Sequence, residues 1–558
     1  MTRLVPALCA GLIIAALPAP LGAQTAEQAV RFVTERGGRV VRDVEAPGQP
    51  VIAVDLSYTA TADRDLDLLT ALGQFRELNL EHTTVTSAAM KAVVRLKGLR
   101  TLNVSGTFVG NDGVRALLAL ADLRELHLDG VRVDGEGLKD VVRLPKLERL
   151  HYTGWHAMNR DALAELVKAP GLRELRLAHC RLGSWRPPLK PADPRSAGPG
   201  LGADLTGVPV VSLRWLTELP RLEVLDLSDN LIGDADVAVL AGIKTLRTLR
   251  LSGNHLSPAS LDALARLPGL EVLALDVPVS DATVTKAAAL KKLRALTLIG
   301  PYEGTRLTRA GFAALGGLRE LRSLVLSTGE AEEPDWRDLA GLEELGLHVA
   351  AKDRWPGAGL CALTRLRKLH TGTVQAKALA ALEGLECLWV PLGDADLKYL
   401  KGMKRLQTLN GVVPSDAGIA ELVEMKSLRK LTLRVTKITD SGVKLLTQLP
   451  HLEDLDIGCN DGVTEVGLRT LAGCPSLRRL SLYCLHSRLT LPMLEAVAGL
   501  KQLRDLNLGG RFDSRVGLTA DELRVLSGCR HLARLWVSNV TQKEHEAIAR
   551  ALPGCYVP

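Results

Sequence analysis

The sequence contains few aromatic residues and no long apolar run after its N-terminus. Phe, Trp and Tyr together make up 3% of the chain, although hydrophobic residues make up 46%. A core of this composition consists mainly of leucine, valine and alanine. Beyond the N-terminal region, a charged residue interrupts every apolar run within a few positions, which excludes a membrane-spanning helix there.

The sequence also lacks a strong excess of charge of one sign. Its 70 basic and 63 acidic residues give a net charge of +7, and the two signs are interspersed along the chain. A nucleic-acid-binding protein is expected to cluster its basic residues on one surface. We therefore predict a mixed, solvated surface and no nucleic-acid partner.

Motifs of common catalytic and metal sites are absent. The sequence has no Gly-x4-Gly-Lys-Ser/Thr loop, no Gly-x-Ser-x-Gly elbow and no His-Glu-x-x-His helix. It also has no Cys-x-x-Cys pair, so a zinc cluster built on cysteines has no support. We predict a protein that is not an enzyme and carries no cofactor.

A leucine pattern recurs through almost the whole chain. One unit reads Leu123-x-x-Leu126-x-Leu128, the neighbouring units open at Leu99 and Leu147, roughly every 24 residues, and about twenty units follow one another. A period of 20–29 residues with this spacing indicates a solenoid of leucine-rich repeats. We predict an α/β solenoid shaped like a horseshoe, with parallel strands on its concave face and helices on its convex face. Such a fold builds a binding surface without a catalytic site.

Within one unit, the hydrophobic period changes from that of a strand to that of a helix. The second and third leucines should point inward from a short strand. Later in one unit, Val443, Leu446 and Leu449 recur at helical spacing, and Thr439 can cap the helix. Some units between residues 321 and 428 are only 19 to 22 residues long. They leave room for about one helical turn on the convex side.

Two adjacent units carry the most complete form of the motif: Leu222-x-x-Leu225-x-Leu227-x-x-Asn230 and Leu246-x-x-Leu249-x-Leu251-x-x-Asn254. These units resemble the leucine-rich repeats of exported bacterial proteins, especially planctomycete-like ones. They are also similar to the cysteine-containing subclass of F-box proteins, since Cys180 stands at the asparagine position of its own unit. Thr83, Thr107 and Val131 stand there in other units, so we expect an incomplete asparagine ladder.

The resemblance implies a binding scaffold, with two versions left open. The first is a protein- or ligand-binding scaffold that displays a concave recognition surface. The alternative is a substrate-recognition subunit of a ubiquitin-ligase-like complex. That alternative needs an F-box segment, for which residues 24–74 offer no room, and an export signal argues against it.

The domain organisation follows from the boundaries of the repeats. Residues 1–23 read as a signal peptide, with Arg3 before an apolar run and a cleavage site after Ala23. Residues 24–74 form an N-terminal cap with a helix at 26–34 and a strand at 51–56, and residues 75–531 form the repeat array. A Pro/Gly-rich insertion occupies about 184–209, and residues 532–558 hold the last repeat and a C-terminal cap. We predict an exported protein that is periplasmic, secreted or attached to the cell surface.

Cysteines allow two interpretations in an exported chain. Cys459 and Cys484 each follow the opening leucine of their unit by seven positions, and equivalent positions of stacked strands lie about 5 Å apart. They are therefore a possible disulfide. The other interpretation is that both are small apolar residues of the repeat core.

Candidate binding residues occupy the outward position between the second and third leucines. Asn103, His127, His151 and Arg176 hold this position in successive units, and Trp389 holds it in a later unit. The hypothesis is a ligand-contacting patch, and the alternative is an ordinary solvated strand face. His127 and His151 could bind a metal with Asp129, but two histidines on parallel strands are a weak signal, so we predict no metal. We expect a monomer whose partner is a protein or a cell-surface ligand.

Overall fold

The computed structural model describes residues 25–153, 161–180, 182, 212–350, 357–372, 374–433, 436–458, 462–482, 489–509, 519–537, 542–552 and 555–557. The predicted signal peptide, the Pro/Gly-rich insertion and the possible Cys459–Cys484 disulfide lie outside these residues.

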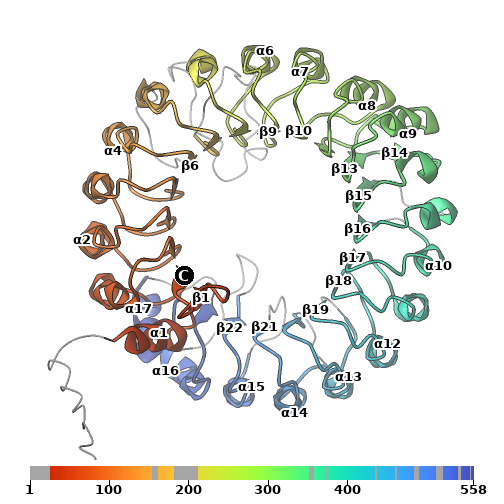
Figure 1. The fold of residues 1–558 in the computed structure, drawn as a ribbon. Helices are drawn as coiled ribbons and strands as arrows, with labels where there is room; N and C mark the ends of the chain where they lie inside the picture. Colours follow the sequence, from red (N-terminus) through yellow and green to blue (C-terminus); the bar gives the residue numbers. More distant parts are fainter. Residues whose placement is uncertain are drawn as a thin grey trace, which may run out of the picture.

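A sheet of 21 strands runs through the described part of the chain and lines the concave face of a solenoid (Figure 1). The strands are β1 Arg39–Arg42, β2 Val51–Asp55, β3 Glu77–Asn79, β4 Thr101–Asn103, β5 Glu125–His127, β6 Arg149–His151, β7 Glu174–Arg176, β8 Val224–Asp226, β9 Thr248–Leu251, β10 Val272–Asp276, β11 Ala295–Ile299, β13 Ser323–Thr328, β15 Glu344–Val349, β16 Lys368–Thr371, β17 Cys387–Trp389, β18 Thr408–Asn410, β19 Lys430–Thr432, β20 Asp454–Asp456, β21 Arg479–Ser481, β22 Asp505–Asn507 and β23 Arg534–Trp536. From β2 onward, neighbouring strands pair in parallel, one strand per unit, as the leucine period predicts. A separate two-stranded sheet joins β12 Arg306–Leu307 to β14 Glu330–Ala331.

Helices cover the convex side (Figure 1). The α-helices are α1 Ala26–Glu35, α2 Met90–Val93, α3 Asn111–Ala116, α4 Gly135–Val141, α5 Asp161–Ala164, α6 Asp234–Leu240, α7 Ser260–Leu264, α8 Asp281–Ala287, α9 Arg309–Gly316, α10 Ala376–Leu379, α11 Asp394–Leu397, α12 Asp416–Leu422, α13 Asp440–Leu446, α14 Glu465–Thr470, α15 Leu491–Ala498, α16 Ala520–Leu523 and α17 Gln542–Ala551. Several units have 3₁₀ helices in addition or instead, namely η1 Asp63–Leu72, η2 Ser87–Ala89, η3 Leu117–Ala119, η4 Glu165–Lys168, η5 Leu213–Glu218, η6 Trp336–Leu339, η7 Ala358–Ala362, η8 Lys398–Leu400, η9 Leu471–Gly473 and η10 Arg524–Gly528. Among the described residues, every helix falls short of the length and hydropathy that a membrane crossing requires.

The hydrophobic core lies between the sheet and the helices. Leu126 and Leu150 face each other across β5 and β6, and both are fully buried. Val443, Leu446 and Leu449 on the helical side of a later unit are buried as well. The inward leucines and the helical period therefore meet in one continuous core, as the sequence predicts.

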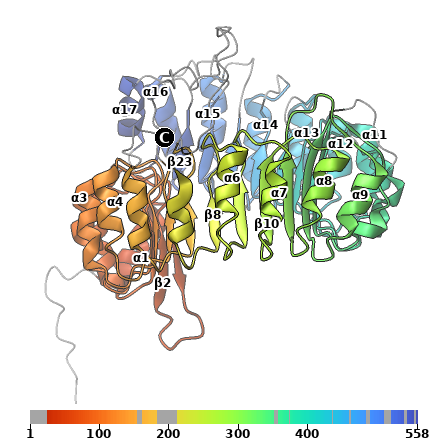
Figure 2. The ribbon, with the colours of Figure 1, turned by 90° about the horizontal axis from the view of Figure 1, so that it is seen from above.

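A helix and a hairpin precede the repeats, in the segment that is predicted to form an N-terminal cap. Thr25 and Gln28 form a reciprocal capping box at the start of α1, which confirms the predicted helix. The predicted strand is β2, and it also pairs with the antiparallel strand β1, which the sequence analysis does not predict. The hairpin of β1 and β2 extends beyond the rim of the solenoid (Figure 2).

The compressed units between residues 321 and 428 differ in their convex elements. In the units that open at Leu321 and Leu366, η6 and α10 have four residues each, about one helical turn as predicted. The prediction is wrong for the units that open at Leu385 and Leu406, where α11 runs directly into η8 and α12 has seven residues. The insertion before residue 212 leaves the sheet intact, because Leu175 in β7 pairs directly with Leu225 in β8.

Asn230 and Asn254 form a short hydrogen-bonded ladder between neighbouring units. The Asn230 side chain donates to the Leu177 carbonyl and accepts from the Cys180 amide, and Asn254 makes the corresponding bonds one unit later. In another unit the Thr107 hydroxyl instead donates to the Val104 carbonyl at 2.6 Å. The ladder is incomplete, as expected, and a threonine replaces part of it.

The two ends of the solenoid meet. Figure 1 shows the strands following an almost complete circle, and Figure 2 shows α15, α16 and α17 at a different level from α1, α3 and α4. The guanidinium of Arg534 lies 5.4 Å from the ring centroid of Tyr58, and the rings of Tyr58 and Trp536 are 6.2 Å apart. Gly37 has a φ of +80°, and a Cβ atom there would lie 2.4 Å from Ala533 Cβ. The N-terminal cap therefore packs directly on the last repeats.

Candidate ligand-binding site on the concave face

Strand register brings four of the five predicted binding residues into one column. Asn103 pairs with His127, His127 with His151, and His151 with Arg176 across β4 to β7. Each residue stands between two buried apolar or aromatic residues, so its side chain points to the concave side. Stacking of the repeats therefore places these four side chains next to one another.

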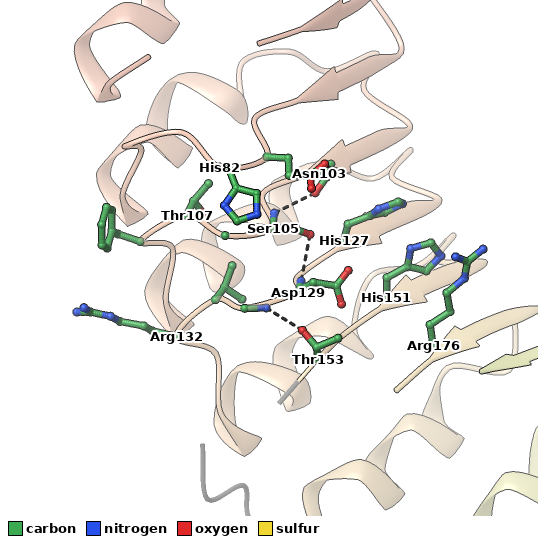
Figure 3. A pocket seen from close by; sticks show the side chains of 15 residues that line it. His82, Asn103, Ser105, Thr107, His127, Asp129, Arg132, His151, Thr153 and Arg176 are labelled. Atoms are coloured by element: carbon green, nitrogen blue, oxygen red, sulfur yellow. Dashed lines mark hydrogen bonds between the residues drawn. The ribbon is translucent and has the colours of Figure 1, made fainter. Parts of the chain in front are cut away.

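A cavity of about 820 Å³ opens beside this column. Its lining consists of Glu81, His82, Asn103, Ser105, Gly106, Thr107, Phe108, His127, Asp129, Gly130, Val131, Arg132, His151, Thr153 and Arg176. Figure 3 shows His127, His151 and Arg176 side by side, with Asp129 between the histidines and the loop that follows the strands. The volume lies within the range of small-molecule and side-chain binding sites.

His127 belongs to a charged cluster within the strands. Its Nε2 lies 2.7 Å from Glu125 Oε1, and Arg149 donates to Glu125 Oε2 at 2.7 Å. The hydrogen bond from His127 and the bond and charge of Arg149 lower the pKa of Glu125 to about 2, although partial burial opposes the shift. Glu125 is therefore an anion at neutral pH and holds the His127 ring in place.

His151 repeats this arrangement one unit later. Its Nε2 lies 3.0 Å from Glu174 Oε1, and Arg176 donates to the same oxygen at 2.7 Å. The bond from His151 and the charge of Arg176 lower the pKa of Glu174 to about 2. His151 is 8% exposed, and its ring centroid lies 4.0 Å from that of His127. The two imidazoles thus form a closely packed pair, tilted by 42° to each other, and each ring contacts a carboxylate.

Asp129 is the most desolvated acid of the cavity. Burial raises its pKa, and the nearby His151 and His127 oppose that shift. Its backbone amide donates to the Ser105 hydroxyl at 3.1 Å, and the next amide, of Gly130, donates to the Thr153 hydroxyl at 3.0 Å. Figure 3 shows both bonds. These contacts fix the loop that carries the carboxylate toward the histidines.

A second set of hydrogen bonds orients Asn103. Its amide nitrogen donates to Glu81 at 3.2 Å, and its oxygen accepts from the Ser105 amide at 2.9 Å. Glu81 also accepts from the Tyr58 hydroxyl at 3.0 Å. Tyr58 is the residue of the N-terminal cap that contacts Trp536, so a chain of contacts joins the meeting point of the two ends to this cavity.

Trp389, the fifth predicted residue, lies elsewhere. It stands in the same column, opposite His370, but on β17, across the circle from β6 (Figure 1). Its side chain is 37% exposed and packs edge-on against His370, with ring centroids 4.0 Å apart. His370 in turn packs against His348 at 4.4 Å. Trp389 therefore points outward, and it belongs to a separate aromatic cluster.

Sequence reasoning missed part of the site. Arg149 and Glu174 lie on the outward face of their strands, two residues before His151 and Arg176. The alternating charges of Glu125, Arg149 and Glu174 at this position were the sequence signal that could have indicated their part in the site. His82, Arg132 and Thr153 come from loops after the strands, where the repeat gives no fixed direction to a side chain. Gly106, with a φ of +64°, lets His82 approach, because a Cβ there would lie 2.5 Å from the imidazole.

Comparisons with known proteins agree with the repeat architecture. One family model described as leucine-rich repeat matches residues 210–256 and 220–276, and a second matches residues 448–472. The chain is 30% identical over 301 residues to podocan-like protein 1 of Homo sapiens, covering 52% of this chain and 48% of the relative. The chain thus spans about half the length of this curated relative.

Solved structures show a similar but more distant likeness. An internalin (InlF) of Listeria monocytogenes is 16% identical, with 75% of this chain and 98% of that chain covered and a TM-score of 0.32. A leucine-rich-repeat protein of Leptospira interrogans is 19% identical, with 84% and 91% covered and a TM-score of 0.28. Likenesses of this degree carry no argument about a ligand. The repeated strand–loop–helix unit shows the fold of a leucine-rich-repeat solenoid, and parts of the chain match family models of leucine-rich repeats.

Proposed function

We propose that the protein is a non-catalytic binding scaffold that recognises a protein or ligand through the cavity on strands β4 to β7. The observation that supports this most is the convergence of Asn103, His127, His151 and Arg176 with Asp129 around one cavity. Ion pairs and hydrogen bonds hold these side chains before any ligand arrives. Binding to a pre-ordered surface loses less conformational entropy than binding to mobile side chains.

The cavity favours a polar ligand. Imidazole, guanidinium, carboxamide and carboxylate groups line it, whereas Phe108 packs under the guanidinium of Arg132 at 5.6 Å. A ligand that enters must therefore replace water at several charged groups with hydrogen bonds of its own. A charged or strongly polar segment of a partner protein meets this requirement, and an apolar one does not.

Co-purification of partner proteins with the wild-type protein and with two variants tests this proposal. The triple variant His127→Ala/His151→Ala/Arg176→Glu removes three groups of the cavity and reverses one charge. The matched control, Thr297→Ala/Thr408→Ala/Thr432→Glu, changes outward residues of β11, β18 and β19. Wild type and control are expected to recover the same partners, and the triple variant is expected to lose them. Equal recovery by all three proteins would leave the cavity without a recognition role.

We also propose that the chain is exported. The basic residue, apolar run and small-residue cleavage site of residues 1–23 support this. Fractionation of cells with mass mapping of the mature N-terminus tests it. The expected product starts near Gln24 outside the cytoplasm, and an intact cytoplasmic chain would contradict it.

A further inference from the structure

Three potential metal ligands converge on the concave face. One ligand atom each from Glu125, His127 and His151 lie within 4.8 Å of one another. The side chains of Glu125, His127 and His151 are 18%, 21% and 10% exposed, so the group is largely shielded from water. Two imidazoles and one carboxylate are a donor set that a divalent transition metal accepts.

Glu125 is oriented to act as a ligand. Arg149 binds its Oε2 at 2.7 Å and leaves Oε1 directed at His127. Carboxylates that bind metals are normally held in this way by a hydrogen bond to their other oxygen. Arg149 therefore positions the carboxylate and does not block the oxygen that a metal would use.

Charge around the group favours a cation. The carboxylates of Glu81, Asp129 and Glu174 lie around the two histidines in addition to that of Glu125. Arg149 and Arg176 face them as cations, while Arg132 points away toward Phe108 (Figure 3). The carboxylates outnumber the guanidinium groups that face the site, so the charge around it favours a cation.

We propose that Glu125, His127 and His151 bind a single divalent transition-metal ion, with Zn²⁺ as the probe. Imidazole ligands favour Zn²⁺ over Mg²⁺ and Ca²⁺, which take oxygen ligands. Asp129, on the loop after β5, is a further acid beside the two histidines that could complete the coordination. The inference goes beyond the proposed function and does not rest on it, because metal binding needs no protein partner.

Small side-chain movements are enough to form the site. Zn²⁺ bonds of about 2.0–2.1 Å in a tetrahedron place ligand atoms about 3.4 Å apart. The present contact of 2.7 Å between His127 Nε2 and Glu125 Oε1 is a hydrogen bond, which coordination of both atoms to the metal would replace. His151 must approach the other two ligands by rotation of its side chain away from Glu174.

Calorimetric titration of ZnCl₂ into tag-free protein tests the proposal. The wild type is expected to bind one Zn²⁺ in excess of any weak surface binding. His127→Ala/His151→Ala should lower the affinity by more than about 100-fold, because even loss of an outer partner typically costs 10–100-fold. Glu125→Gln, which keeps the size of the side chain, should lower it by at least about 10-fold.

A second histidine pair in the same protein provides the matched control. The rings of His348 and His370 also pack together, edge to face, but have no carboxylate contact among the described residues. His348→Ala/His370→Ala should bind Zn²⁺ within about twofold of wild type, by the usual context tolerance of such sites. Circular dichroism shows whether each variant is folded. If His127→Ala/His151→Ala does not fold, the Zn²⁺ affinity of Glu125→Gln decides the test. Absence of Zn²⁺ binding by the wild type, or unchanged binding by folded Glu125→Gln, would overturn the proposal.

Discussion

Two pairs of packed histidines occupy the concave face, and their neighbours give them different properties. His127 and His151 each hydrogen-bond a glutamate, whereas His348 packs against His370, and His370 packs against Trp389. Burial lowers the pKa of His348 and His370, and His348 adds to the lowering at His370. The same side chain on the same sheet thus belongs to an ionic cluster in one region and to an aromatic cluster in the other.

The difference comes from the outward residues beside each imidazole. Glu125 stands two residues before His127, and Glu174 on the next strand contacts His151, whereas Lys368 stands two residues before His370 and Gly346 two residues before His348. Side chains at i and i+2 of a strand share one face, so these residues decide what each imidazole meets. The comparison teaches that the leucines set the scaffold and that pairs of outward residues set its chemistry.

Removing the carboxylates should have the largest effect on the ionic cluster. We expect Glu125→Ala/Glu174→Ala to lower the free energy of unfolding by about 2 kcal/mol per glutamate, because hydrogen bonds to charged, largely buried groups are lost. Urea denaturation measures the change. Glu453→Ala is the control, since Glu453 also pairs with an arginine but is 44% exposed, and it should cost less than about 1 kcal/mol. If Glu453→Ala cost as much unfolding free energy as each of the other two glutamate substitutions, the ionic cluster would contribute no more than a surface ion pair.

The two regions should also lose stability in different pH ranges. The lowered pKa values of Glu125 and Glu174 mean that their contribution is present above the unfolded value near 4.3 and is lost as the pH falls toward about 2. The lowered pKa values of His348 and His370 mean that their contribution is present above 6.5 and is lost as the pH falls through their folded values. Thermal unfolding from pH 8 to pH 2 measures both.

Variants assign each part of that pH profile. His348→Gln/His370→Gln should flatten the decline that begins below pH 6.5, and Glu125→Gln/Glu174→Gln should flatten the decline below about pH 4.3. If either double variant flattens the other range instead, the assignment of charges to the two regions is wrong.

A smaller change should convert one cluster toward the other. Lys368→Glu places a carboxylate two residues before His370, as Glu125 stands before His127. The new negative charge should raise the pKa of His370, because it stabilises the protonated ring. Nuclear magnetic resonance titration of the histidines measures the shift, and His127 serves as the internal control. No upward shift at His370 would show that the neighbouring residue does not set the difference.

The smallest effect is expected at the aromatic cluster itself. Trp389→Ala should cost about 0.5–1.5 kcal/mol of unfolding free energy, the range for an aromatic pair, since the side chain is partly exposed. Urea denaturation measures it beside Leu388→Ala, which empties a fully buried position and should cost about 2–5 kcal/mol. A loss at Trp389 as large as that at Leu388 would place the tryptophan in the core.

The scaffold was accessible from the sequence because each leucine has a fixed direction. The inward Leu126 and Leu150, the N-cap Thr439 and the outward column with His127 and His151 all follow from the repeat period. Their positions depend on local spacing, which a single sequence displays. The register across the insertion follows as well, because the strands on either side pair directly.

Other features depend on contacts that the repeat period does not specify. Glu174 meets His151, and Asp129 is desolvated, because of side-chain geometry within and after the strands. Contact between Tyr58 and Trp536 depends on curvature summed over all repeats, so small differences per unit decide whether the ends meet. The lengths of single units therefore do not predict whether the two ends meet.

Anomalous diffraction at the zinc absorption edge tests the central comparison most directly. Crystals of the tag-free protein soaked in ZnCl₂ should show a peak between Glu125, His127 and His151 and no peak at His348 and His370. This result would show that the neighbouring carboxylate makes a histidine pair into a metal site. A peak only at His348 and His370, or none at His127 and His151, would contradict the account.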